Sequence, residues 1–153
     1  MTKFKQREET NYIIVHISDS PQGRGDGAVE IDRWHRERGF DAIGYHYVIL
    51  EDGTVEQGRP VLAVGAHCRA DGRNHDSIGI CLIGHSGERT VTQLDSLQLL
   101  ISNLSNVFGN LQIHGHSDFD ENKEFCPGFK VCETLMNHIS RLVKKPLGYS
   151  MSD

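Results

Sequence analysis

Two histidines and one cysteine are of the residue types that a catalytic zinc site requires. His16 lies near the end of the apolar run YIIVHI, His116 lies in a GHSD segment, and Cys126 follows His116 by ten residues in a CPG tripeptide. Zinc prefers imidazole and thiolate ligands in a tetrahedron, and a catalytic site combines three protein ligands with a water molecule. His16, His116 and Cys126 would supply such a set and hold one Zn2+ per chain.

A purely structural interpretation of the same residues stays open at this point. A histidine at a strand end is more often hydrogen-bonded structure than a metal ligand, and an isolated cysteine most often behaves as a small buried hydrophobe. The chain also lacks the closely spaced CxxC pairs that are typical of structural zinc sites. Spacing alone therefore does not choose between a metal site and a packed core.

The elements that would position these side chains begin with strands. Runs rich in β-branched and other apolar residues predict strands over 12–17, 77–83 and 111–114, and the run 77–83 has the composition of a central strand buried on both faces. Residues 45–50, the turn pair Asp52-Gly53 and the TVEQ segment after it predict a β-hairpin. Residues 61–68 are expected to be short and extended.

Three further segments have the three- and four-residue apolar spacing of amphipathic helices, namely 28–38, 92–108 and 129–143. Asp26 and Thr92 are the expected N-caps of the first two. The order of elements predicts an α/β fold with a single domain, in which helices flank a mixed central β-sheet. We expect this domain to span 1–153, with a core of about 3–145 and a tail of 146–153.

Sheets of this kind carry ligand sites at the ends of their strands. His16, Tyr45 and His116 all lie at predicted strand ends. We therefore expect these three side chains to converge on one site.

Charge and composition argue against several classes of partner. The formal net charge of -5 lacks the basic surface that phosphate binding needs, so we expect no nucleic-acid partner. Neither a signal peptide nor an apolar stretch of about 20 residues is visible, so we expect no membrane insertion and a cytoplasmic location. The four cysteines are irregularly spaced, which argues against a disulfide framework.

Six stretches of the sequence resemble one enzyme family. IIVHIS, GYHYVILEDGTVEQGRP, VGAHC, NHDSIGICLIG, GHSDF and CPGF occur in the order seen in type 2 N-acetylmuramoyl-L-alanine amidases. The resemblance runs from about Lys3 to the last predicted helix and is greatest to the short phage-lysozyme amidases. The peptidoglycan recognition proteins belong to the same family. The combination of stretches is far more specific than any one of them.

The resemblance implies roles for individual residues. In this family His16, His116 and Cys126 would bind zinc, and Tyr45 would position or deprotonate the attacking water. His67, in VGAHC, matches a position that lines the substrate cleft. The resemblance therefore implies a substrate-binding role for His67.

A lysine near the last zinc ligand would stabilise the oxyanion, and here the sequence departs from the family. The phage enzymes usually place this lysine two residues before the cysteine, where this chain has Glu124. Lys123, three residues before Cys126, is the nearest candidate. A solvated lysine in a charged loop is the alternative interpretation.

The activity that the resemblance implies is hydrolysis of the amide between N-acetylmuramic acid and L-alanine in bacterial peptidoglycan. A phage endolysin would accumulate in the cytoplasm of the infected cell and reach the wall after membrane lesion. A cytoplasmic amidase that acts on recycled wall fragments is the alternative.

Two competing functions come from other classes. One is a peptidoglycan-binding module without catalysis, since recognition proteins keep this fold while losing the metal cysteine. The other is a regulator that binds a host RNA polymerase, as some phage amidases do. We expect a monomer in each case.

The remaining histidines are weaker candidates. His46 follows Tyr45 and should point to the opposite face of the strand, which favours a structural role. His114 would share the face of His116 if the strand continued, and it ranks below His116 as a metal ligand. His35, His75, His85 and His138 have no support from motif or spacing.

Overall fold

The computed structural model describes residues 4–144, which form a five-stranded sheet in the order β3-β2-β4-β1-β5. The strands are β1 (Tyr12–Ile17), β2 (Tyr47–Ile49), β3 (Val55–Gln57), β4 (Ser77–Leu82) and β5 (Gln112–Gly115). β4 pairs in parallel with β1 and with β2, β5 pairs in parallel with β1, and only β3 runs antiparallel to its neighbour. The predicted mixed sheet and the hairpin at its edge are confirmed.

The two central strands are the most apolar segments of the chain. Every residue of β4 is buried, and β1 is buried from Ile13 onward. Parallel strands covered on both faces need such continuous apolar runs, which explains why SIGICL and YIIVHI occupy the middle of the sheet. The predicted central position of residues 77–83 is therefore confirmed.

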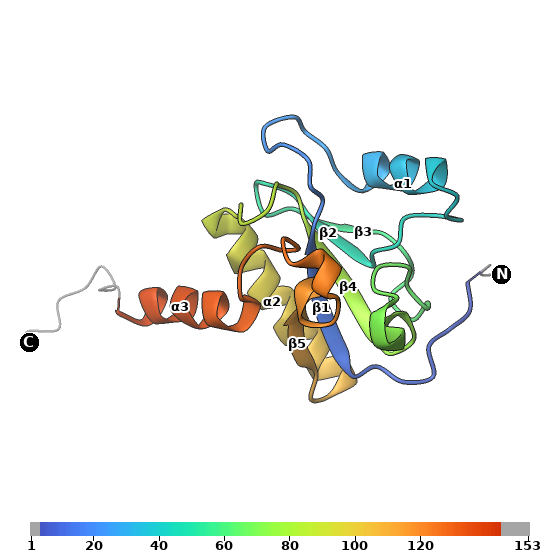
Figure 1. Cartoon of the computed structure of the whole chain (residues 1–153). Coiled ribbons are helices and arrows are strands. Elements are labelled where there is room, and N and C mark those ends of the chain that lie inside the picture. Colours follow the sequence, from blue (N-terminus) through green and yellow to red (C-terminus); the bar gives the residue numbers. More distant parts are fainter. Residues whose placement is uncertain (1–3, 145–153) are drawn as a thin grey trace, which may run out of the picture.

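Helices cover both faces of the sheet (Figure 1). On one face, Ile13 and Val15 of β1 and alternate residues of β4 pack with Leu97 of α2 (Val91–Phe108) and Leu135 of α3 (Val131–Lys144). On the other face, Cys81 packs with Ile31 of α1 (Ala28–Glu37). Because side chains alternate along a strand, His16 must share the face of α1 rather than that of Ile13 and Val15.

Two predicted helix caps are wrong by one and two residues. Gly27 rather than Asp26 caps α1, and the Ala28 backbone N–H donates to the carboxylate of Glu56, while Asp26 pairs with Arg24. Thr90 rather than Thr92 caps α2, where its hydroxyl accepts a hydrogen bond from the Gln93 N–H. In both cases the helix itself lies where the apolar spacing predicted it.

The remaining described residues form loops and short 3-10 helices, η1 (Ala70–His75), η2 (His116–Asp118) and η3 (Glu121–Lys123). Residues 61–68, expected to be extended, form no strand and contribute only an isolated bridge between Gln6 and Ala63. All four cysteines are free thiols.

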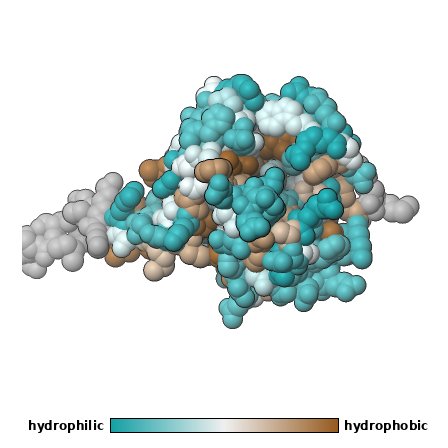
Figure 2. Space-filling model, viewed as in Figure 1, coloured by the Kyte–Doolittle hydropathy of each residue, from teal (hydrophilic) through white to brown (hydrophobic). Residues whose placement is uncertain are grey.

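Hydrophilic residues cover most of the face in Figure 2, and hydrophobic ones lie toward its middle. Within residues 4–144 no helix has the length and apolar character to cross a membrane. The sheet and the helices on its two faces form the α/β architecture that the sequence predicted. The predicted tail of 146–153 lies outside the described residues.

Candidate metal centre

Parallel pairing of β1 and β5 brings His16 and His116 together. Val15 lies opposite Gly115 in the register, so each histidine follows at the same edge of the sheet. The two rings lie with their centroids 4.6 Å apart. His16 is only 1% exposed and His116 is 8% exposed. The predicted convergence of these two strand ends is confirmed.

Cys126 reaches the same place through a loop of short turns. The backbone N–H groups of Phe119 and Asp120 both donate to the His116 carbonyl, and Ser117 N–H donates to the Cys126 carbonyl at 2.9 Å. The loop therefore folds back on its own start. Cys126 Sγ lies 3.8 Å from His16 Nδ1.

His16, His116 and Cys126 form the one group of at least three His, Cys, Asp or Glu residues within 4–144 that could hold a metal ion, with ligand atoms within 4.8 Å of one another. Burial lowers the pKa of His16 and of His116, so both imidazoles are neutral near pH 7 and retain a lone pair. Burial raises the pKa of the Cys126 thiol, and a metal ion would displace its proton. This donor set fits zinc.

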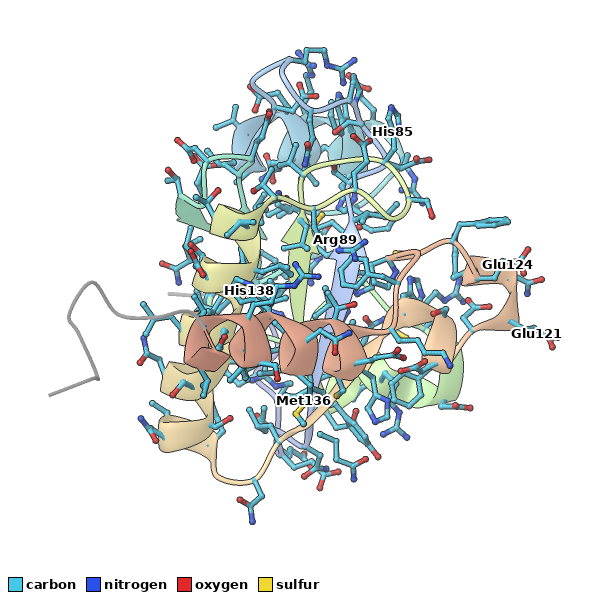
Figure 3. All side chains as sticks on the ribbon, turned by 90° about the vertical axis from the view of Figure 1, so that its left-hand side faces the viewer. His85, Arg89, Glu121, Glu124, Met136 and His138 are labelled. Carbon is cyan, nitrogen blue, oxygen red and sulfur yellow. The ribbon has the colours of Figure 1, made fainter. Side chains whose placement is uncertain are left out.

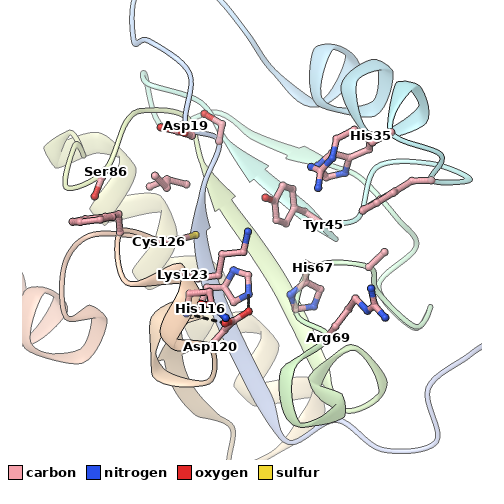
Figure 4. Close-up of a pocket in the computed structure, with 17 residues that line it drawn as sticks. Asp19, His35, Tyr45, His67, Arg69, Ser86, His116, Asp120, Lys123 and Cys126 are labelled. Carbon is pink, nitrogen blue, oxygen red and sulfur yellow. Dashed lines mark hydrogen bonds and ion pairs between the residues drawn. The ribbon is translucent and has the colours of Figure 1, made fainter.

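A pocket of about 600 Å³ opens above these residues (Figure 4). His116 and Cys126 line it from one side, and Tyr45 and His67 from the other. Cationic Arg38 and Arg69 and anionic Asp19 and Asp120 also reach its wall. The pocket is thus open, polar in part and wide enough for more than a water molecule.

Tyr45 lies beside the three candidate metal ligands but is not one of them. Its ring centroid lies 5.0 Å from that of His16, and the residue precedes β2 instead of opening the strand as predicted. Burial raises the pKa of Tyr45 well above its ordinary value, and the neighbouring Cys81 and Cys126 add to the shift. The hydroxyl therefore stays protonated at neutral pH and is able to donate a hydrogen bond.

Lys123 rather than Glu124 lines the pocket. η3 ends at Lys123, and the Cys126 N–H donates to the Lys123 carbonyl at 2.9 Å. Figure 3 shows Glu121 and Glu124 on the outer side of this loop. The pKa of His16 is lowered first by burial, then by three neighbouring histidines, and then by Lys123. The positive charge of Lys123 is therefore felt at His16.

His35 lines the same pocket, although the sequence analysis gave it no support. Its Nδ1 accepts a hydrogen bond from the Gly44 N–H at 2.8 Å, and its ring centroid lies 5.3 Å from that of Tyr45. Burial lowers its pKa to about 4. The position was detectable, because His35 follows Ile31 by one helical turn and so shares its buried face.

His46 and His114 lie outside the metal group. His46 Nε2 donates to the Ala63 carbonyl and its Nδ1 accepts from the Gly79 N–H, which agrees with the predicted structural role. His114 pairs instead with Asp118, at 3.0 Å.

Comparison with known proteins places the chain in one family. Residues 6–129 match the family model Amidase_2, described as N-acetylmuramoyl-L-alanine amidase. The endolysin of Escherichia phage T7 is 39% identical over 134 residues, which cover 83% of this chain and 86% of that protein.

Two solved structures are similar over nearly their whole length. The N-acetylmuramoyl-L-alanine amidase LysC from Clostridium intestinale URNW superposes with a TM-score of 0.78 at 32% identity, covering 91% of each chain. Drosophila PGRP-LB superposes with a TM-score of 0.73 at 25% identity, covering 99% of this chain and 90% of that one. The sequence, the fold and the family match agree, and the chain belongs to the N-acetylmuramoyl-L-alanine amidase family as an enzyme of that class.

Proposed function

We propose that this amidase uses one zinc ion, held by His16, His116 and Cys126, to hydrolyse the amide between the lactyl group of N-acetylmuramic acid and L-alanine. The observation that carries the proposal is the position of these three ligand types, within 4.8 Å of one another beside an open pocket. A binding module without catalysis has no need of a thiolate beside two imidazoles. The complete set therefore favours the enzyme.

The ion would lower the pKa of water at its open position to about 7 and polarise the scissile carbonyl. The protein's own contribution is to orient the reactants. Because its hydroxyl stays protonated, Tyr45 would help to orient the attacking water by hydrogen bonding. The proton lost by that water would leave to the solvent in the open pocket. Lys123, which also lines the pocket, would share the negative charge that develops on the carbonyl oxygen.

The biological role that we infer is that of a phage endolysin. The endolysins of phages T7 and T3 are both 39% identical to this chain over 134 residues, which supports an enzyme that is made in an infected cell and degrades its wall after membrane lesion. One catalytic domain, with the core we place at about 3–145, would be sufficient for this activity. Bacterial peptidoglycan would be its substrate.

The products of the reaction test this function directly. Incubated with purified peptidoglycan, the protein should release stem peptides with a free L-alanine amino terminus, detectable by mass spectrometry. A chelator should stop the release, and added Zn2+ should restore it, because the ligands would be left without their ion. Cleaved glycan strands with intact stem peptides, or wall binding without any release, would contradict the proposal.

Lys123 and Glu124 offer a matched pair of variants. Lys123→Met should lower kcat by roughly 10²-fold with zinc still bound, because one oxyanion-stabilising charge is lost. Glu124→Gln, one residue away on the outer side of the loop, should leave kcat unchanged. Rates of stem-peptide release, measured for both variants and wild type, test the role of Lys123. Equal rates for Lys123→Met and wild type would show that Lys123 is only a solvated lysine.

A further inference from the structure

We infer that His67 is a positioning residue for the metal ligand His16 and does not itself bind substrate. The inference rests on the proposed zinc site. The observation behind it is a chain of hydrogen bonds that leads from a backbone carbonyl through Ser77 and His67 to His16.

The hydrogen bond between Ser77 and the Arg73 carbonyl fixes the direction of the other two hydrogen bonds. Ser77 Oγ donates to the Arg73 carbonyl at 2.5 Å, and a carbonyl only accepts. The single hydroxyl proton is thereby used, so Ser77 Oγ must accept from His67 Nε2–H, at 3.1 Å. A neutral imidazole with its proton on Nε2 has a lone pair on Nδ1. His67 Nδ1 therefore accepts from His16 Nε2–H at 2.8 Å.

This hydrogen bond determines which ring nitrogen of His16 is free to bind the metal. With its proton held on Nε2, His16 presents the lone pair of Nδ1, and Nδ1 is the atom that lies 3.8 Å from Cys126 Sγ. Metal-binding histidines usually donate their second ring N–H to a fixed acceptor, which sets both tautomer and ring orientation. Here that acceptor is a second, neutral histidine instead of a carboxylate.

The surrounding backbone is shaped to receive the His67 ring. A Cβ on Gly79 of β4 would lie 2.6 Å from His67 Cγ, and a Cβ on Gly65 would lie 2.5 Å from His67 Cδ2. Two glycines thus leave the space that the ring fills. Ser77 is 0% exposed and His67 is 7% exposed, so both side chains are largely shielded from water.

Both ring nitrogens of His67 have partners inside the protein, which leaves neither for a substrate. His67 lines the pocket, but its Nδ1 is already paired with His16 and its Nε2 with Ser77. The cleft-lining position implied by the family resemblance is therefore compatible with a role that acts through His16.

Zinc affinity, measured by competition with a chromophoric chelator, tests the inference without relying on activity. His67→Leu should weaken zinc binding by about 10- to 100-fold, because His16 loses its acceptor. His67→Asn should recover most of that loss, since the asparagine Oδ1 takes the place of the histidine Nδ1. Ser77→Ala, a smaller change, should weaken zinc binding in the same direction even if His67→Leu fails to fold.

His138→Asn is the matched control. His138 is also a buried histidine, but it pairs with Asp95 between α2 and α3, away from the pocket. Its variant should bind zinc as wild type does. Unchanged zinc affinity in His67→Leu and Ser77→Ala, or a raised KM as their only defect, would overturn the inference. If wild type itself bound no zinc, the proposed function would fail. That result is distinguishable from a wild type that binds zinc and variants of His67 and Ser77 that bind it equally well, which would overturn only the role of His67.

Discussion

Cys126→Ala is expected to abolish zinc binding and amidase activity together. A tetrahedral catalytic site has three protein ligands, and removal of the only thiolate leaves two neutral imidazoles to hold a dication. Without the ion, water near pH 7 supplies almost no nucleophile. We expect the rate of stem-peptide release to fall by roughly 10³-fold or more. We also expect little zinc to remain in the purified protein, because the site loses one of its three proposed ligands.

Cys132→Ala provides the control for this experiment. Cys132 is an exposed thiol in α3, where it donates to the Ile113 carbonyl, and it lies outside the metal group. Its variant should keep full zinc content and full activity. A Cys126→Ala protein that is folded, zinc-loaded and active would show that the thiolate is not a ligand.

Tyr45→Phe should separate catalysis from metal binding. The tyrosine ring lies beside His16, but the hydroxyl belongs to no metal-ligand group. Loss of that hydroxyl would remove the hydrogen bond that we propose orients the attacking water, whereas the phenylalanine ring keeps the packing. We expect kcat to fall by roughly 10²- to 10³-fold, the range for losing one positioned hydrogen-bond donor, with zinc content unchanged.

Tyr47→Phe is a closely matched control for this variant. Tyr47 lies two residues further along the chain. It packs against the hydrophobic core between the sheet and helices α2 and α3, and it does not line the pocket. Steady-state rates and elemental analysis of both variants give the comparison. Equal activity of Tyr45→Phe and Tyr47→Phe would remove Tyr45 from the mechanism.

The sheet was predictable because its strands are marked by composition alone. SIGICL and YIIVHI are too apolar for any place but the centre, and the Asp52-Gly53 pair marks the hairpin. The alternation of side chains along β1 then puts His16 on the face opposite Ile13 and Val15. The convergence of His16 with His116 follows from strand ends and parallel pairing.

Helix ends were less predictable, for two different reasons. At α1, the carboxylate of Glu56 from β3 accepts from the Ala28 N–H, and such a partner, distant in sequence, escapes a local rule. At α2, Thr90 and Thr92 each have a candidate partner three residues later, Gln93 and Asp95, so spacing alone did not select the capping box that Thr90 and Gln93 form.

The partners of His67 were beyond the reach of sequence reasoning. The ring fits because neither Gly65, two residues before His67, nor Gly79 of β4 has a Cβ where the ring lies. The choice between Lys123 and Glu124 likewise depended on the 3-10 turn of η3, which turns one side chain inward and the other outward.

Zinc K-edge X-ray absorption of the purified enzyme distinguishes a zinc site with a cysteine ligand from one without. We predict about one zinc per chain, with one sulfur at about 2.3 Å and nitrogen or oxygen ligands at about 2.0–2.1 Å. The sulfur shell should disappear from any zinc that remains in Cys126→Ala. An active enzyme that contains no zinc, or zinc surrounded only by nitrogen and oxygen, would rule out the proposed site.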